Sequence, residues 1–107
     1  MTPVIPISAL ADGDMLPCRV AGLEVLICRI DGRFFALSNR CSHAGQALHT
    51  GRLHGYRLGC PLHGASFDVR DGRCLKAPAE AGVVTYPVTI AGGKVHVGVD
   101  TPRRPPD

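Results

Sequence analysis

The stretch LPCRVAGLEVLICRIDGRFFALS, residues 16–38, decides the fold of this chain. Ala21-Gly22 separates an apolar run at 16–20 from a second run at 23–30, and Asp31-Gly32 separates the second run from 33–38. Because such dipeptides accept the positive φ angles of tight hairpin turns, we predict three antiparallel strands here. Asp71-Gly72 likewise predicts a hairpin between 66–70 and 73–76, and Gly92-Gly93 predicts another between 83–90 and 94–99.

The rest of the chain supports an all-β fold of small antiparallel β-sheets or a sandwich. No window longer than ten residues shows a helical period, and 107 residues leave room for one compact domain. We predict a single domain over residues 1–100 with a loop-rich insertion at about 39–67. Residues 101–107 include three prolines and little to bury, so we predict a disordered tail there.

Composition and charge exclude several classes of protein. No run approaches 18 uncharged apolar residues, and the N-terminus lacks the features of a signal peptide, so we expect a cytoplasmic chain with no membrane segment. The net charge is +3, and the segment 39–76 has six Lys and Arg against two Asp and Glu. This excess is too weak to indicate nucleic-acid binding, but it favours an acidic surface on a protein partner.

The chemistry of the chain lies in its cysteines and histidines. Five cysteines in a chain expected to stay in a reducing compartment argue against a disulfide framework. Two short motifs each offer one thiolate and one imidazole: Cys41-Ser42-His43 and Cys60-Pro61-Leu62-His63-Gly64. These ligands suit iron or zinc, and their arrangement matches a [2Fe–2S] centre whose two cysteines hold one iron and whose two histidines hold the other.

With these motifs the sequence resembles the Rieske iron–sulfur family. The resemblance covers most of the chain and implies one [2Fe–2S] cluster with Cys41, His43, Cys60 and His63 as its ligands. It also implies the Rieske iron–sulfur fold, with the histidines near solvent as the path for electrons. A structural zinc site is the alternative reading of the same four residues.

Details of the two motifs resemble the low-potential ferredoxin branch of this family. High-potential members have an additional cysteine in each cluster loop, where this chain has Gln46 and Leu62. They also have a serine and a tyrosine whose hydroxyls donate to sulfur, where this chain has Ala65 and Phe67. Ser66 is one position away, and strand alternation directs it elsewhere. Because donors to sulfur stabilise the reduced cluster, their loss predicts a lower potential.

The other candidate residues have plainer interpretations. We expect the three remaining cysteines to be small apolar residues of strands, and the three remaining histidines to be surface or turn residues rather than ligands. Ala77-Pro78-Ala79 resembles the family's proline-containing loop over the cluster. The residues concerned are Cys18, Cys28 and Cys74, and His49, His54 and His96.

These observations predict an electron carrier rather than an enzyme. The chain has no room for a mononuclear-iron catalytic domain and no G-x-G-x-x-G fingerprint for a dinucleotide. The resemblance implies a soluble, monomeric ferredoxin component of a bacterial aromatic-ring-hydroxylating dioxygenase system. It would contact, transiently, a flavin-dependent NAD(P)H reductase and a terminal oxygenase. Two alternatives remain: the small Rieske subunit of an assimilatory nitrite reductase, and a zinc-stabilised interaction module.

Overall fold

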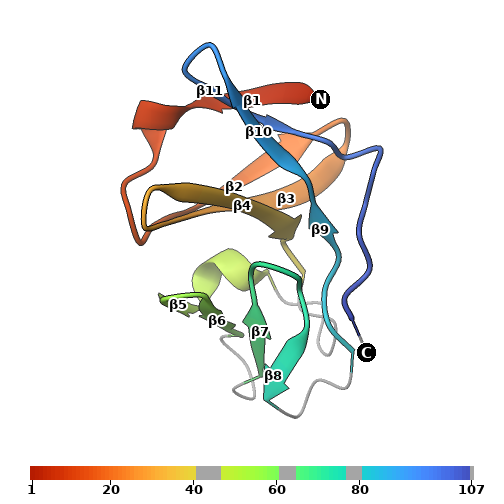
Figure 1. Ribbon diagram of the computed structural model, residues 1–107. Coiled ribbons are helices and arrows are strands. Elements are labelled where there is room, and N and C mark those ends of the chain that lie inside the picture. Colours follow the sequence, from red (N-terminus) through yellow and green to blue (C-terminus); the bar gives the residue numbers. More distant parts are fainter. Residues whose placement is uncertain (41–46, 61–64, 77–80, 107) are drawn as a thin grey trace.

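The chain forms three small antiparallel sheets and two short 3-10 turns in the computed structural model, which describes residues 1–40, 47–60, 65–76 and 81–106 (Figure 1). The described residues contain no α-helix. Their two 3-10 turns are too short to cross a membrane. The elements are β1 (Thr2–Pro6), η1 (Ile7–Ala9), β2 (Met15–Val20), β3 (Leu23–Ile30), β4 (Arg33–Ser38), η2 (Leu48–Thr50), β5 (Arg52–His54), β6 (Arg57–Gly59), β7 (Ser66–Asp68), β8 (Cys74–Lys76), β9 (Thr85–Tyr86), β10 (Val88–Ala91) and β11 (Lys94–Val97).

The sheets lie as three successive layers in Figure 1. The terminal sheet has the strand order β1-β11-β10, the middle sheet β2-β3-β4-β9, and the distal sheet β5-β6-β7-β8. The all-β fold predicted from the sequence is confirmed. The strands predicted at 23–30 and 33–38 have the expected bounds, and β2 begins one residue earlier than predicted.

The hairpin turns take the backbone conformation that their residues predict. Ala21 and Gly22 have φ of 50° and 82°, and Asp31 and Gly32 have φ of 51° and 76°. Two successive positive φ angles match the right-handed twist of the flanking strands, which is the reason these dipeptides close two-residue hairpins. The pairs Val20↔Leu23 and Ile30↔Arg33 then fix the register of the whole middle sheet.

The strand β3 is the centre of the molecule because both of its faces are buried. Val25 and Ile27 pack against the terminal sheet, in one core cluster with Val95 and Val97. Leu26 and Cys28 face the other way, in a second cluster that contains residues of the distal sheet. The continuous apolar run VLIC at 25–28 is therefore the signature of a strand that lies between two layers.

Proline residues produce two differences from the predicted strands. The strand expected at 83–90 is divided at Pro87: Tyr86 pairs with Ala36 of the middle sheet, whereas Val88 pairs with Val97 of the terminal sheet. Pro87 has no N–H for either ladder, but its carbonyl accepts a hydrogen bond from Gly98. β1 was not predicted; it contains Pro3 and Pro6 and lies at an edge of its sheet, where proline is tolerated.

The C-terminal segment, predicted as a disordered tail, is held at one point. Arg103 and Thr85 exchange two backbone hydrogen bonds, of 2.8 and 3.0 Å. A Cβ at Gly82 would meet the side chain of Pro105, so the segment also packs closely on the chain before β9. Residues 103 and 105 therefore lie against the body of the domain.

Candidate metal centre

The first predicted ligand loop leaves the middle sheet at the end of β4 and is closed at its base by Asn39. The segment that contains Cys41 and His43 lies outside the described residues, but both of its flanks are described. Arg40 and Ala47 pair as an antiparallel bridge, and the N–H of Leu48 donates to the carbonyl of Asn39. The two ends of the loop are thus held side by side.

The buried side chain of Asn39 contributes two further bonds at this base. Its Oδ1 accepts the backbone N–H of His49 at 2.9 Å, which leaves its Nδ2 facing the ring Nδ1 of His49, also at 2.9 Å. Because Nδ2 is a donor, Nδ1 must accept and the ring proton lies on Nε2. His49 is therefore an exposed turn residue whose inner nitrogen is engaged by Asn39, in the role that the sequence predicted.

The second predicted loop connects β6 to β7 and begins at Cys60. The N–H of Cys60 donates to the carbonyl of Ala65 at 2.7 Å, so the base of this loop is also closed by a backbone bond. Cys60 is 6% exposed, and residues 61–64, which include His63, lie outside the described residues. Cys60 is the one predicted ligand whose position the structure describes.

The two loops are brought together by the hairpin of β5 and β6, which the sequence did not predict. β5 continues the chain that leaves the first loop, and β6 leads into the second; Arg52 pairs with Gly59 directly before Cys60. A Cβ at Gly51 would collide with the carbonyl oxygen of Gly59, so the close approach requires glycine. Thr50, Gly51, Arg52, Gly59 and Cys60 line a pocket of about 340 Å³.

Cys60 lies in an apolar environment on its inner side. Ala65 and Phe67 are fully buried and belong to the same core cluster as Cys60, together with Leu48 and Leu58. Ser66 pairs with Gly59 and Lys76 and lies on the opposite face of β7, as alternation predicted. The two positions at which the high-potential branch has hydroxyl groups are thus occupied by buried side chains without donors.

The charged residues near the loops differ in their distance from Cys60. Arg57 is the first residue of β6 and lies opposite Asp68 in the β6–β7 ladder, at the end of the strand away from Cys60. Arg52 lines the pocket with Cys60 and forms no ion pair with the described carboxylates. Arg40 is paired with Glu24 at 3.0 Å. Arg52, which the sequence did not single out, is therefore the basic residue next to the described ligand; its pairing with Gly59 was hidden because this hairpin was missed.

An ion pair between the buried Asp68 and the half-exposed Arg70 fixes the far end of the distal sheet. Arg70 Nε and Nη2 donate to both carboxylate oxygens of Asp68, at 3.0 and 2.8 Å, and the guanidinium lies 4.2 Å from the centre of the Tyr56 ring. The hydrogen bonds from Arg70 hold the pKa of Asp68 below its usual value, although burial acts in the opposite direction.

The remaining cysteines lie in strands, as predicted. Cys28 is fully buried in β3, where loss of solvation raises the pKa of its thiol to about 12. Cys18 in β2 is half-buried, and burial raises its thiol pKa as well. Cys74 in β8 pairs with Phe67. The predicted covering loop, Ala77-Pro78-Ala79, lies outside the described residues, as do Gln46 and Leu62.

The donor set fits a mixed cysteine and histidine centre. Cys60 is shielded from solvent on its inner side and held by the backbone hydrogen bond to Ala65, which are features that orient a metal ligand and limit solvent access to it. Each of the two closed loops supplies one cysteine and one histidine of the sequence. This combination of soft and imidazole ligands suits an iron–sulfur cluster.

Comparison with known proteins gives the same result. The chain is 38% identical over 86 residues to the ferredoxin component of a naphthalene 1,2-dioxygenase system from Pseudomonas aeruginosa, which covers 80% of this chain and 83% of that protein. It is 35% identical over 100 residues to the ferredoxin component of biphenyl 2,3-dioxygenase from Rhodococcus jostii strain RHA1, covering 94% of each.

Solved structures are equally similar. The ferredoxin of carbazole 1,9a-dioxygenase from Nocardioides aromaticivorans IC177 superposes with a TM-score of 0.86 at 35% identity, over 91% of this chain and 97% of that one. A ferredoxin in complex with the oxygenase of carbazole 1,9a-dioxygenase gives a TM-score of 0.84 at 27% identity, over 90% and 99%. The model of the Rieske [2Fe–2S] domain matches residues 1–87. With its two closed loops, its ligand types and these relatives, the chain belongs to the Rieske [2Fe–2S] family and has the one [2Fe–2S] cluster of that family as its cofactor.

Proposed function

We propose that this protein is the one-electron carrier of a ring-hydroxylating dioxygenase system and that Cys41, His43, Cys60 and His63 hold its cluster. The observation that supports this most strongly is the pairing of Arg52 with Gly59, which ties two motifs distant in sequence at adjacent loop bases. When bound, a [2Fe–2S] cluster accepts and releases one electron. In this assignment the domain spans residues 1–100, and its cluster-binding part at 39–67 is continued by β8 to Lys76.

The chain itself performs the remaining tasks. Asn39 and the backbone hydrogen bond between Cys60 and Ala65 hold the bases of the two loops. The buried side chains of Phe67 and Ala65 exclude water from the inner side of Cys60 and contain no hydroxyl or other hydrogen-bond donor. We therefore assign a potential at the low end of the Rieske range, on the order of −150 mV.

The potential is tested by one pair of serine and alanine variants. Ala65→Ser adds a hydroxyl within the core cluster that contains Cys60, and it should raise the midpoint potential in voltammetry. Ser66→Ala removes a hydroxyl from the opposite face of β7 and should leave the potential unchanged. A wild-type midpoint well above zero would contradict the low-potential assignment.

The partners follow from the same assignment. An NAD(P)H-dependent flavin reductase supplies the electron, and a terminal aromatic-ring-hydroxylating oxygenase takes it, each in a transient contact with a monomeric, cytoplasmic carrier. A carrier must release its partner between two encounters, so the contact should be small and charge should act on the encounter rate. The relatives named above are ferredoxin components of dioxygenase systems, and one solved structure similar to this chain is a complex of an oxygenase with a ferredoxin in carbazole 1,9a-dioxygenase.

Small charged oxidants test where the electron leaves, independently of any partner. The reduced protein is mixed with anionic ferricyanide or cationic hexaammineruthenium(III) in a stopped-flow instrument. Arg52→Glu should slow the first reaction roughly threefold at physiological salt and accelerate the second, since reversing one charge about 10 Å from a trivalent ion changes their screened interaction by somewhat under 1 kcal/mol.

Arg57→Glu is the matched control, because it has the same charge change at the far end of β6. Its effect should be clearly smaller than that of Arg52→Glu. Equal effects of the two substitutions would contradict electron exit beside Cys60.

A further inference from the structure

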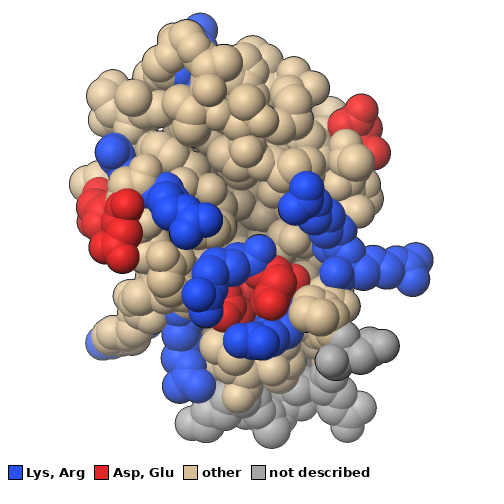
Figure 2. All heavy atoms as spheres, viewed as in Figure 1, with Lys and Arg blue, Asp and Glu red and all other residues tan. Residues whose placement is uncertain are grey.

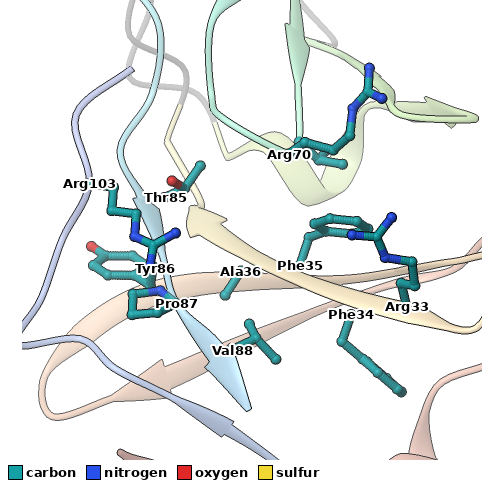
Figure 3. Close-up of a pocket in the computed structure, with 11 residues that line it drawn as sticks. Arg33, Phe34, Phe35, Ala36, Arg70, Thr85, Tyr86, Pro87, Val88 and Arg103 are labelled. Carbon is teal, nitrogen blue, oxygen red and sulfur yellow. The ribbon is translucent and has the colours of Figure 1, made fainter. Parts of the chain in front are cut away.

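A second basic site lies on the side of the molecule, in a pocket of about 320 Å³ between the middle sheet and the C-terminal segment (Figure 3). Arg33, Phe35 and Ala36 of β4 form one wall, and Tyr86 and Pro87 form another. In Figure 3, the guanidinium groups of Arg33 and Arg103 stand on two sides of this pocket. With Val69 and Arg70, four segments distant in sequence therefore contribute to one hollow.

The two arginines at this pocket lack acidic partners in the described part of the chain. Arg33 lies over the ring of Phe35, with 5.4 Å between its Cζ and the ring centre, and it forms no ion pair there. Arg103 is anchored by its backbone to Thr85, and its guanidinium also forms no ion pair with a described carboxylate. Arg70 lines the pocket too, but its charge is balanced by Asp68. Among the residues that the structure describes, the pocket thus has two arginines whose charge no carboxylate balances.

The surrounding surface extends this positive character. Figure 2 shows Lys and Arg side chains gathered around one acidic spot in the middle of the visible face. Asp68 and Asp71 are the acidic residues that pair with Arg70 and Arg73. Exposed arginines beside Phe35 and Tyr86 have the composition of binding hot spots, since Arg and aromatic side chains contribute most to the energy of protein interfaces.

This pocket is separate from the loops that hold the predicted ligands. It lies along the first half of β4, whereas the first loop follows the end of that strand. Arg33 and Ser38, at the two ends of β4, are about 17 Å apart along an extended strand. Arg70 likewise follows the end of β7 opposite to Ala65 and the second loop.

We propose that this pocket is a docking site for an acidic segment of a protein partner, whose carboxylate lies between Arg33 and Arg103. A protein partner is favoured over a small free anion because both arginines are exposed. A small anion there stays hydrated and is held weakly, whereas a protein surface covers the site and excludes water from it. The inference does not depend on the proposed electron carrier, because it uses no residue of the ligand loops.

A glutamate peptide serves as the probe for this docking site. Hexaglutamate is titrated into the ¹⁵N-labelled full chain with its cluster, at low salt, and backbone amide shifts are recorded. We expect shifts at pocket residues such as Phe35, Tyr86 and Val88. Shifts confined to residues 50–60, or no shifts, would overturn the proposal.

Two double variants with equal loss of charge complete the test. Arg33→Gln combined with Arg103→Gln should weaken hexaglutamate binding about tenfold, the effect of two exposed charge pairs. Arg19→Gln combined with Lys94→Gln should leave binding within about twofold, because neither residue lines the pocket. Equal weakening by the two double variants would show attraction to net charge alone and would refute the site.

Inorganic phosphate, titrated at the same charge concentration, distinguishes a protein partner from a small anion. We expect phosphate to shift the pocket amides at least tenfold more weakly than hexaglutamate does. Equal shifts and affinity would identify a small-anion site and overturn the assignment to a protein. Reduction by dithionite and the visible spectrum report separately on the electron carrier in every variant.

Discussion

The side chain of Asn39 should control how firmly the first ligand loop is held. Asn39→Ala removes the bonds to the N–H and to Nδ1 of His49, both 2.9 Å long in a residue that is 6% exposed. At about 1 kcal/mol for each net hydrogen bond, local opening of the loop base becomes easier by about 2 kcal/mol. This corresponds to a roughly 30-fold increase in the open population.

The assay is the rate at which the cluster is lost to an iron chelator, followed by the bleaching of its visible absorption. Asn39→Ala should accelerate the loss by up to about 30-fold, and His49→Ala, which removes one of the two bonds, by about fivefold. The double variant should lose no more than Asn39→Ala alone, because the two residues share the bond that His49→Ala removes. His54→Ala, at an exposed position in β5, is the matched control.

The result that would refute this reasoning is equally specific. If Asn39→Ala loses its cluster no faster than His54→Ala, then the loop base is not the element that opens. Fully additive effects of Asn39→Ala and His49→Ala would also contradict the shared bond, since residues without an interaction add independently.

Three further predictions follow from the buried groups. Hydrogen bonds from Arg70 lower the pKa of Asp68, so the stability that they supply is present above the ordinary carboxyl pKa of about 4 and is lost as the pH falls through the lowered folded-state pKa. Wild type should therefore lose more unfolding free energy than Asp68→Asn between pH 5 and pH 3. Cys28, with its thiol pKa raised to about 12, should resist iodoacetamide at pH 8 in the folded protein and react after denaturation; fast native labelling, seen by peptide mass, would contradict its burial. Gly51→Ala forces β5 and β6 apart at Gly59 and should lower the yield of cluster-loaded protein severalfold. The control Gly55→Ala, in the open turn of the same hairpin, should cost about 1 kcal/mol of stability and leave the cluster fully loaded.

The middle sheet could be predicted from sequence because its turns are encoded locally. Ala21-Gly22 and Asp31-Gly32 need no tertiary contact to favour a hairpin, and the bounds of β3 and β4 were right. The ligand types were also visible, since two copies of a cysteine and histidine pair specify their chemistry without a structure.

Other features depend on contacts that no local pattern reports. The β5–β6 hairpin has three-residue strands in a segment rich in glycine and histidine, so its alternation is too short to detect. As a result, the sequence could not show that strand pairing brings Arg52 beside Gly59 and so next to Cys60. The bonds of Asn39 to His49 link positions ten apart and need the folded loop base. Thr85 likewise holds Arg103 through a pairing that a proline-rich segment does not suggest.

The most direct test of the central claim is the number of histidine nitrogens bound to the cluster. The protein is produced with ¹⁵N-labelled histidine, reduced with dithionite and measured by pulsed electron paramagnetic resonance. We predict hyperfine couplings from two histidine nitrogens, with one of them lost on His43→Cys or His63→Cys, beside two iron and two sulfide per chain. A protein that contains zinc without sulfide, or a reduced cluster without histidine coupling, would contradict the assignment of Cys41, His43, Cys60 and His63.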